Sequence, residues 1–408
     1  MNDNKTASIE EIRAHFPALN RICNGFPVAY FDGPGGTQVP RSVVEAMNDY
    51  LFNHNANSHW AYPSSAETDE IILNSRRAFA DFLNCSADEV AFGQNMTSLT
   101  FHLARALGRN FTSDDEIIVT ELDHHANVDT WRSLEKERGV KIRVVPMDIE
   151  SGTLEFGELE NLLNSKTKLL AIGAASNAIG TMPDVKKACE TARANNTLSF
   201  VDAVHYAAHS LIDVQDFGCD FLACSAYKFY GPHIGILFGR KEIMETIDFP
   251  KLRPAPNNSP ERAETGTQSH ESIAGAGATV EFLASLSNGE TRREKLQNSF
   301  AAIHLRKMEL FKTLWNNLGE INGVTLFGLN PEARRTPTIA FKVNDFEART
   351  VTEKLAARGV FTSHGDFYAS TVVEKLGLQN QGLVRAGIAC YTNADEIERL
   401  IEGVRSLI

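Results

Sequence analysis

The sequence predicts an α/β fold with a mostly parallel sheet that carries helices on both faces, followed by a smaller α+β domain. Over residues 141–196 short apolar runs alternate with amphipathic stretches, which is the strand-helix-strand rhythm of a parallel sheet. The length of 408 residues exceeds that of a usual single domain, and the hydrophobic fraction of 43% is ample for a packed core. Beyond residue 291 a long helical pattern precedes several short strands, which indicates the smaller domain.

These patterns divide the chain into three parts. We expect an N-terminal helical segment at 1–25, a large domain at 26–290 and a small C-terminal domain at 291–408. Apolar runs bounded by turn residues predict strands at 28–31, 89–93, 116–120, 142–145, 168–173, 200–202, 325–326, 338–343 and 359–362. Apolar residues at helical spacing predict helices at 8–19, 40–53, 65–84, 99–107, 159–163, 184–194, 272–287, 291–318 and 394–407.

Composition excludes several classes of function. The net charge of −12 argues against binding to nucleic acid or to an anionic membrane surface, and no apolar run approaches the roughly 18 residues of a membrane span. The six cysteines lack CxxC spacing, so we expect neither a disulfide framework nor a zinc knuckle, and a reduced, cytoplasmic compartment fits best. His124 and His125 follow Asp123, but no third ligand follows at metal spacing, so we expect no metal.

The most informative stretch runs from residue 200 to 240. Asp202 ends one apolar run, and Lys228 lies in a turn after another, 26 residues later (228 − 202). A lysine that forms a Schiff base and a carboxylate that keeps a pyridine nitrogen protonated are the two groups that pyridoxal phosphate (PLP) requires. A strand, a connection and a second strand fit between the two residues, and ligands belong at the C-terminal ends of such strands.

This stretch resembles the class V aminotransferases, within them the branch of the cysteine desulfurases and selenocysteine lyases. The pattern Asp…Ser-x-His-Lys-x-x-Gly-Pro of that branch matches Asp202 and the run SAYKFYGP at 225–232. Similar segments extend from Tyr30-Phe31-Asp32 to the C-terminal helix, so the resemblance covers nearly the whole chain. It implies the PLP-dependent transferase fold of type I, with a small amino acid as substrate.

The resemblance also implies roles for individual residues around the cofactor. Lys228 would form the Schiff base, Asp202 would hold the ring nitrogen, and His125 would stack on the ring and move protons. Asn177 and His205 would meet the phenolic oxygen O3′. The phosphate would be bound by Met96 and Thr97 at a helix N-terminus, by Ser225, and by Gly266 and Thr267 of a partner subunit. The family usually has His at position 227, where this chain has Tyr227. The resemblance therefore does not say which group donates to the phosphate at that position.

Free amides and hydroxyls at a helix N-terminus form an anion site in their own right, although an ordinary Thr or Ser cap has the same sequence. A phosphate site completed by a partner's residues implies a homodimer with a shared active site. From residues alone, 250–270 would be a polar, proline-rich linker.

Four residues are candidate substrate contacts. Arg385 matches the arginine that binds the substrate carboxylate, a task suited to the guanidinium fork. Gly36, in the Gly-rich turn after Asp32, and His59, in the run Asn-Ala-Asn-Ser-His-Trp, match segments at the pocket of the family, while His364 belongs to the loop before Arg385. A tight turn without a ligand, a surface histidine and a salt-bridging arginine are the alternatives.

One expected residue is absent. The desulfurases attack substrate sulfur with a cysteine on the loop before the arginine, and the corresponding segment here, FTSHGDFY at 361–368, has none. Cys390 lies beyond Arg385 in an expected strand, where a buried small hydrophobe is typical. We therefore expect a desulfurase-like lyase that acts by elimination at Cβ. An aminotransferase, an epimerase or a catalytically silent PLP-binding homologue remain alternatives, and a sulfur-acceptor protein cannot be named.

Overall fold

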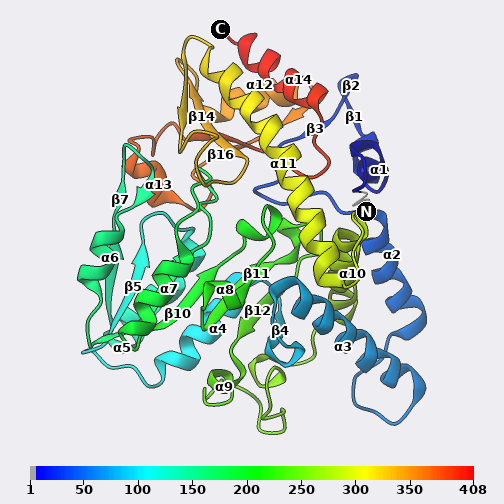
Figure 1. Cartoon of the computed structure of the whole chain (residues 1–408), viewed down its shortest axis with the longest axis vertical. Coiled ribbons are helices and arrows are strands. Elements are labelled where there is room, and N and C mark those ends of the chain that lie inside the picture. The colour runs from blue at the N-terminus through cyan, green and yellow to red at the C-terminus, as the bar shows by residue number, and fades with distance from the viewer. Residues whose placement is uncertain (1–5) are drawn as a thin grey trace.

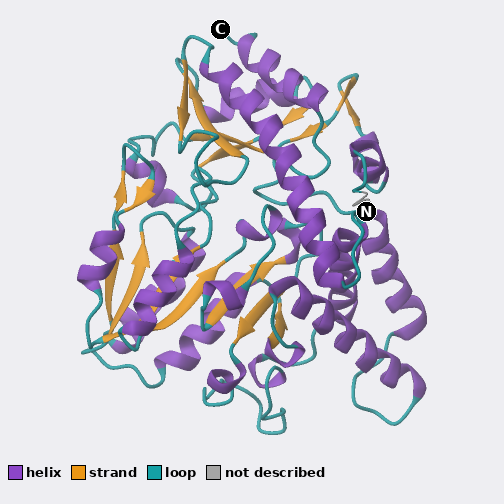
Figure 2. Ribbon diagram, in the orientation of Figure 1, coloured by secondary structure: helices purple, strands orange, loops and turns teal. Residues whose placement is uncertain are grey.

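The computed structural model describes residues 6–408 and is built around a seven-stranded sheet (Figures 1 and 2). Its strand order is β4 (Val90–Gly93), β12 (Gly235–Gly239), β11 (Phe221–Ser225), β10 (Leu198–Asp202), β9 (Thr167–Gly173), β5 (Glu116–Thr120) and β6 (Lys141–Val145). All pairs from β11 to β6 are parallel, whereas β12 runs antiparallel to both of its neighbours. The predicted α/β class with a mostly parallel sheet is confirmed.

Helices cover both faces of this sheet because its strands are buried on both sides. In β9, Leu169 and Ala171 pack into one core, whereas Leu170 and Ile172 pack into the other. This apolar run without alternation is typical of strands in a covered parallel sheet. One face carries α4 (Met96–Gly108), α5 (Asp129–Arg138) and α9 (Lys241–Met244). The other carries α3 (Pro63–Leu83), α6 (Phe156–Leu162), α7 (Val185–Ala194), α8 (Val214–Phe217) and α10 (His270–Ser285).

A second, antiparallel sheet lies in the C-terminal part of the chain, at the top of Figure 1. Its order is β13 (Val324–Phe327), β14 (Thr338–Val343), β17 (Leu383–Gly387) and β16 (Ser363–Gly365). The core beneath it includes residues of α11 (Arg292–Gly319), α12 (Ala348–Ala356) and α14 (Ala394–Arg405). β3 (Ala29–Tyr30) pairs with β15 (Val360–Phe361), so an N-terminal strand joins this part of the molecule.

Most predicted elements differ from the observed ones only at their ends, and three differ further. The helix expected at 8–19 is α1 (Ile9–Ala14), because Pro17 cannot continue it and begins a separate 3₁₀ turn. The helix expected at 40–53 is α2 (Arg41–Asp49) followed by a π-helical turn at Tyr50–His54. The strand expected around Cys390 is absent, since β17 ends at Gly387.

Four further short strands and one helix complete the chain: β1 (Ile22–Cys23), β2 (Phe26–Pro27), β7 (Met147–Asp148), β8 (Thr153–Leu154) and α13 (Ser370–Lys375). The proposed domain division at 291 coincides with Thr291, the N-cap of α11, but stays a prediction. The first five residues of the segment predicted at 1–25 lie outside the described residues.

The longest helix, α11, joins the two sheets (Figure 1). Near its start Arg293 donates hydrogen bonds to the carbonyls of Asp81, Phe82 and Ile212, at 2.8 to 3.0 Å. In its middle Lys307 is only 1% exposed; its Nζ donates to the carbonyl of Ala208 at 2.9 Å and lies 3.2 Å from Nδ1 of His209. Burial lowers the pKa of Lys307 to about 7.

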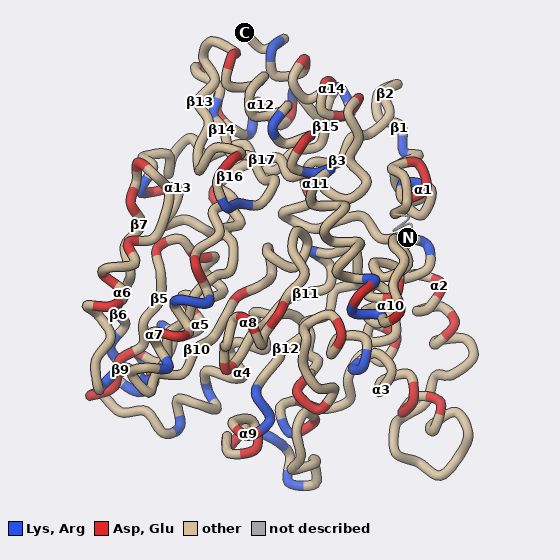
Figure 3. The backbone as a smooth tube through the Cα atoms, in the orientation of Figure 1, with Lys and Arg blue, Asp and Glu red and all other residues tan. Residues whose placement is uncertain are grey.

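Charged residues of both signs are mixed along most elements (Figure 3). Within residues 6–408 no helix combines the length and the apolar character that crossing a bilayer requires.

The buried amine of Lys307 predicts a pH-dependent penalty on stability. Its folded pKa of about 7 lies below the ordinary lysine value of 10.5, so the unfolded chain binds more protons between these two values. The penalty is complete below the folded pKa and is relieved as the pH rises toward the unfolded one. Lys307→Met should therefore increase the free energy of unfolding at pH 6 by about 1–4 kcal/mol.

Urea denaturation of both proteins at several pH values measures this difference. We expect the advantage of the variant to shrink between neutral and alkaline pH. A destabilised variant, or a difference that does not change with pH, would contradict the assignment.

Candidate active site

The candidate site lies where three neighbouring parallel strands end together. The register pairs Asp202, the last residue of β10, with Gly173 at the end of β9 and with Ala223 near the end of β11. A cavity of about 570 Å³ opens at this edge. Its lining consists of Gln94, Asn95, Met96, Thr97, Ser98, Asp123, His124, Ala126, Gly173, Ala175, Asn177, Asp202, Val204, His205, Ser225, Tyr227, Lys228 and His233. The fold thus brings most of the predicted cofactor residues into one cavity.

Two buried carboxyl groups share the floor of this cavity. Burial raises the pKa of Asp202 to about 6, and burial together with the charge of Asp202 raises the pKa of Asp123 to about 8. Asp123 accepts hydrogen bonds from the amide of Gly173 at 2.8 Å and from Nδ2 of Asn127 at 2.9 Å. Asp202 therefore ionises first, and near neutral pH it carries the negative charge of the pair.

Lys228 follows β11 and lies in the cavity with its amine held by a neighbouring turn. Nζ donates to the carbonyls of Pro34 and Gly35 at 2.6 and 3.0 Å. Burial, reinforced by the positive charge of Arg385, lowers the pKa of Lys228 to about 7. Part of the amine population is therefore neutral near pH 7, which is the form that attacks an aldehyde or accepts a proton.

The N-terminus of α4 forms one end of the cavity. The amide of Met96 donates to Oγ of Ser225 at 3.0 Å, and the amide of Ser98 donates to Oδ1 of Asn95 at 2.9 Å. The amide and hydroxyl of Thr97, between them in sequence, have no hydrogen bond to another described residue. First-turn amides together with the helix dipole favour an anion, and the predicted phosphate residues line this end.

The structure places His124 in the cavity, and the role assigned to His125 requires correction. The His125 ring lies outside, with Nδ1 2.8 Å from Oδ2 of Asp129 and Nε2 3.0 and 3.2 Å from the hydroxyls of Ser370 and Thr371. His124 lines the cavity instead, and burial lowers its pKa to about 4, so its ring is neutral. Adjacent residues of a turn point in different directions, and the sequence alone did not distinguish them.

Asn177 and His205 both reach the cavity. Nδ2 of Asn177 donates to the carbonyl of Phe367 at 2.9 Å, while its Oδ1 is buried without a partner. Nε2 of His205 lies 3.0 Å from Oγ1 of Thr338 and 3.2 Å from Oγ1 of Thr336, and burial keeps its pKa well below the ordinary value. An unpaired buried oxygen at a cavity wall is available to a ligand.

Arg385 lies on β17 at the boundary between the two sheets. Nη1 donates to the carbonyl of Asn177 at 2.7 Å, and the Phe367 ring covers the guanidinium with its centroid 4.1 Å from Cζ. Nε is buried without a partner, and burial lowers the pKa of Arg385 to about 9. Phe367 belongs to the segment 361–368, which lacks the cysteine of the desulfurases. This segment therefore packs directly on Arg385, the candidate carboxylate-binding group.

Five other predicted residues lie outside the lining of the Lys228 cavity, namely Gly36, His364, His59, Gly266 and Thr267. Gly36 packs against the Tyr227 ring, since a β-carbon there would lie 3.5 Å from Cδ2 of Tyr227. His364 is exposed on β16 and does not line the cavity.

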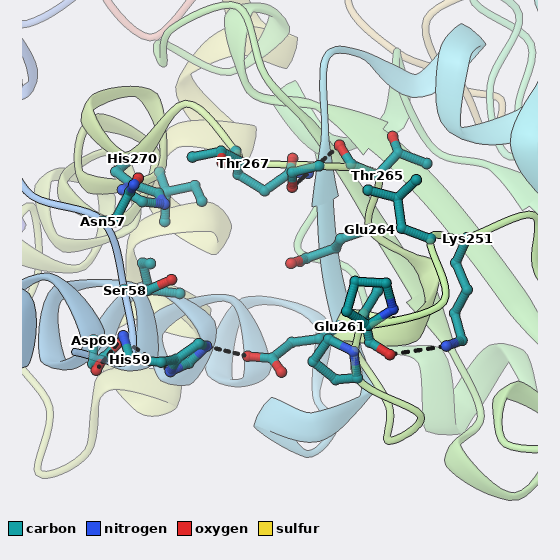
Figure 4. A pocket seen from close by; sticks show the side chains of 18 of the residues that line it. Asn57, Ser58, His59, Asp69, Lys251, Glu261, Glu264, Thr265, Thr267 and His270 are labelled. Carbon is teal, nitrogen blue, oxygen red and sulfur yellow. Dashed lines mark hydrogen bonds and ion pairs between the residues drawn. The ribbon is translucent and has the colours of Figure 1, made fainter.

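His59, Gly266 and Thr267 line a second, more open cavity of about 1260 Å³ (Figure 4). There the His59 ring lies 3.2 Å from Asp69 and 3.5 Å from Glu261. Within one chain the fold therefore does not bring these three residues to Lys228.

No cysteine lines either cavity. All six cysteines are unpaired, and Cys390 is buried beside Tyr230, whose hydroxyl accepts its amide hydrogen bond at 2.9 Å. Burial raises the pKa of Cys390 to about 11, which leaves it as an unreactive thiol. The residues from 6 to 408 contain no cluster of three or more potential metal ligands.

Comparison with known proteins identifies the family. The model of the aminotransferase class-V family matches residues 29–400, which is most of the chain. The chain belongs to the class V aminotransferase family. The predicted resemblance is thereby confirmed, and the members of this family are PLP-dependent enzymes.

Within the class V aminotransferases, the relatives are named cysteine desulfurases. The protein from Pectobacterium carotovorum is 31% identical over 98% of both chains, and a probable cysteine desulfurase from Halalkalibacterium halodurans is 29% identical over 97% of this chain and 96% of its own. The apo structure of a cysteine desulfurase from Thermococcus onnurineus aligns with a TM-score of 0.88, 26% identity and 98% coverage of both chains. The fold of type I is therefore shared.

The residues present fit the cofactor of the class V aminotransferases. An ionised Asp202 suits a pyridinium nitrogen, Lys228 suits the aldehyde, and the donors at the N-terminus of α4 suit a phosphate. The unpaired Oδ1 of Asn177 is a further buried polar atom that is available to hydrogen-bond a ligand. Sequence reasoning missed His124, Asp123 and His233, for which the only signal was the proximity of each to a predicted residue.

The contacts of His125 predict that its side chain stabilises the start of α13 and does not contact the cofactor. His125→Ala removes the contacts with Ser370 and Thr371 at the start of α13, so hydrogen–deuterium exchange over residues 370–375 should become faster. His124→Ala is the matched control, since the interactions of the His124 ring are with the amide of Ala126 and the ring of Tyr368, both outside α13. Unchanged exchange in His125→Ala would contradict this assignment.

Proposed function

We propose that this chain is a PLP-dependent lyase that cleaves the Cβ–S bond of cysteine or a closely related amino acid by elimination. The balanced reaction converts cysteine and water into pyruvate, ammonia and sulfide. Membership in a PLP-dependent family whose relatives are named cysteine desulfurases supports the substrate class. The observation that carries the elimination is that no thiol lines the cavity around Lys228, so no enzyme persulfide can accept the sulfur.

Lys228 and Asp202 support this chemistry through their charges. When bound, PLP supplies an aldehyde for the lysine and a ring that withdraws electrons from Cα of the amino acid. Asp202 ionises before Asp123 and so holds a proton on the ring nitrogen. Lys228, with a pKa lowered to about 7, is suited to take the proton from Cα.

Three further residues orient the reactants. The ring of His124 is neutral and stacks on the ring of Tyr368, with centroids 5.7 Å apart. It is suited to pack on the face of the cofactor. The guanidinium group of Arg385 is suited to bind the α-carboxylate of the substrate through two parallel hydrogen bonds. The unpaired Oδ1 of Asn177 is suited to accept a hydrogen bond from the bound reactants and so to position them. Sulfide leaves as a stable anion and needs no nucleophile from the protein.

We also propose that the enzyme is a cytoplasmic homodimer in which Gly266 and Thr267 complete the partner's phosphate site. The second cavity supports this arrangement, because exposed apolar side chains such as Trp60 and Leu252, 64% and 69% exposed, lie in it. Six unpaired cysteines are consistent with a reducing compartment.

Product analysis with L-cysteine tests the reaction. We expect equal amounts of sulfide and pyruvate from the PLP-loaded protein and an absorbance band from the lysine-bound cofactor. Lys228→Ala should lose the band and reduce the rate by about a hundredfold or more. Cys390→Ala is the matched control for persulfide chemistry and should keep full activity.

Formation of alanine with a protein persulfide would contradict elimination. So would a stable amino form of the cofactor that a keto acid reverses, because this outcome identifies an aminotransferase. The same experiment with cysteine sulfinate, alanine and serine defines the side chain that the enzyme accepts.

Complementation tests the shared site. Lys228→Ala and Thr267→Ala are each expected to be impaired, but in a mixed dimer one site combines the intact Lys228 of one chain with the intact Thr267 of the other. Co-expression of the two variants should restore about a quarter of the wild-type activity. Activity no greater than that of the two separate variants would contradict a shared site.

A further inference from the structure

The phosphate end of the Lys228 cavity is short of positive charge. A phosphate monoester carries about two negative charges near neutral pH, and the helix dipole offsets only about half a charge. The donors at this end, namely the amides of α4 and the hydroxyls of Thr97 and Ser225, are neutral. Asp123 and Asp202 line the same cavity and add no positive charge. A phosphate bound here therefore requires a cationic side chain.

Only four of the cavity-lining residues can carry a positive charge: His124, His205, Lys228 and His233. Lys228 would bind the aldehyde of the cofactor and is therefore not available to the phosphate. Burial lowers the pKa of His124 to about 4 and that of His205 well below the ordinary value, so both rings are neutral. No arginine lines the cavity. Among the residues that one chain contributes to this cavity, His233 is therefore the remaining candidate for a charged donor to the phosphate.

The turn that contains His233 brings it to the N-terminus of α4. Gly235 pairs with Gly93 in the antiparallel register of β12 and β4, so the residues just before Gly235 approach Asn95, the N-cap of α4. The backbones are so close that a β-carbon on Gly235 would lie 2.4 Å from the carbonyl carbon of Asn95. The pairing of β12 with β4 thus places His233 at the phosphate end of the cavity.

Tyr227 gives the His233 ring a fixed orientation. The two rings are stacked, with centroids 4.8 Å apart and planes inclined by 14°. His233 is exposed, and neither of its ring nitrogens has a hydrogen-bond partner among residues 6–408. A stacked imidazole with free nitrogens is oriented in advance to donate to an anion.

We propose that His233, stacked on Tyr227, donates a charge-assisted hydrogen bond to the phosphate of PLP. The site thereby gains at position 233 the imidazole donor that is missing at position 227. Tyr227 acts as a positioning residue through its ring, and its hydroxyl is not required. The inference rests on the proposed PLP chemistry and adds a residue that this chemistry had not used.

The affinities of the full-length protein for PLP and for pyridoxal, which lacks the phosphate, test the proposal. Both can be measured from the absorbance band of the lysine-bound aldehyde, without any turnover. His233→Ala should weaken PLP binding by about tenfold to a hundredfold, as expected for one hydrogen bond to a charged group. Its affinity for pyridoxal should equal that of the wild type. Tyr227→Phe, which keeps the stacked ring, should bind both compounds like the wild type.

His233→Gln separates charge from hydrogen bonding, because glutamine can donate but is neutral. We expect its PLP affinity to lie between those of the wild type and His233→Ala. Phosphorus NMR of bound PLP should show a changed resonance in both His233 variants and an unchanged one in Tyr227→Phe.

The outcomes distinguish this inference from the proposed function. If the wild type forms no lysine-bound band with either compound, both proposals are wrong. If the wild type binds PLP and His233→Ala binds it equally well, or loses PLP and pyridoxal affinity in equal measure, only the role of His233 is wrong. A loss of PLP affinity in Tyr227→Phe alone would assign the donor to the tyrosine hydroxyl.

Discussion

The site depends on the register of three parallel strands. β9 and β10 end at one level and β11 continues two residues further, so Gly173, Asp202 and Ser225 all lie at the same edge of the sheet. Gly173 is required there, because a β-carbon would lie 2.5 Å from Oδ1 of Asp123. The carboxyl group of Asp123 is fixed by the amide of this glycine, and it keeps its proton while Asp202 ionises. Burial and the charge of Asp202 raise the pKa of Asp123 more than the hydrogen bond from Gly173 lowers it, so these two causes decide which of the two carboxyl groups is charged.

The sequence predicted the parts of this arrangement that depend on periodicity. Apolar runs marked the strands, and Asp202 and Ser225 at their ends, with Lys228 three residues further on, lie together because parallel strands end at a common edge. The N-terminus of α4 was predictable for the same reason, since its cap directly follows β4. In each case a local pattern and a general rule of topology were sufficient.

Other parts depend on contacts that local patterns do not encode. His124 and His125 are neighbours with opposite roles, and a 3₁₀ turn that begins at His125 separates them. Phe367 covers Arg385 although 18 residues (385 − 367) separate them, and the positive φ of 59° at Phe367 gives no signal in a non-glycine residue. The position of His233 follows from the pairing of β12 with β4, which are distant in sequence. Gly266 and Thr267 line the second cavity, which is separate from the cavity around Lys228.

The attachment of α11 has a consequence for the relative positions of the two sheets. Arg293 near the start and Lys307 in the middle fasten this helix to the large domain, while Phe311, Leu314 and Leu318 nearer its end belong to the core of the C-terminal sheet. A hinge between the two sheets would have to bend a continuous helix, whose own hydrogen bonds resist it. One continuous helix therefore sets the orientation of the C-terminal sheet, which carries Arg385, relative to the large sheet, beside which Lys228 lies.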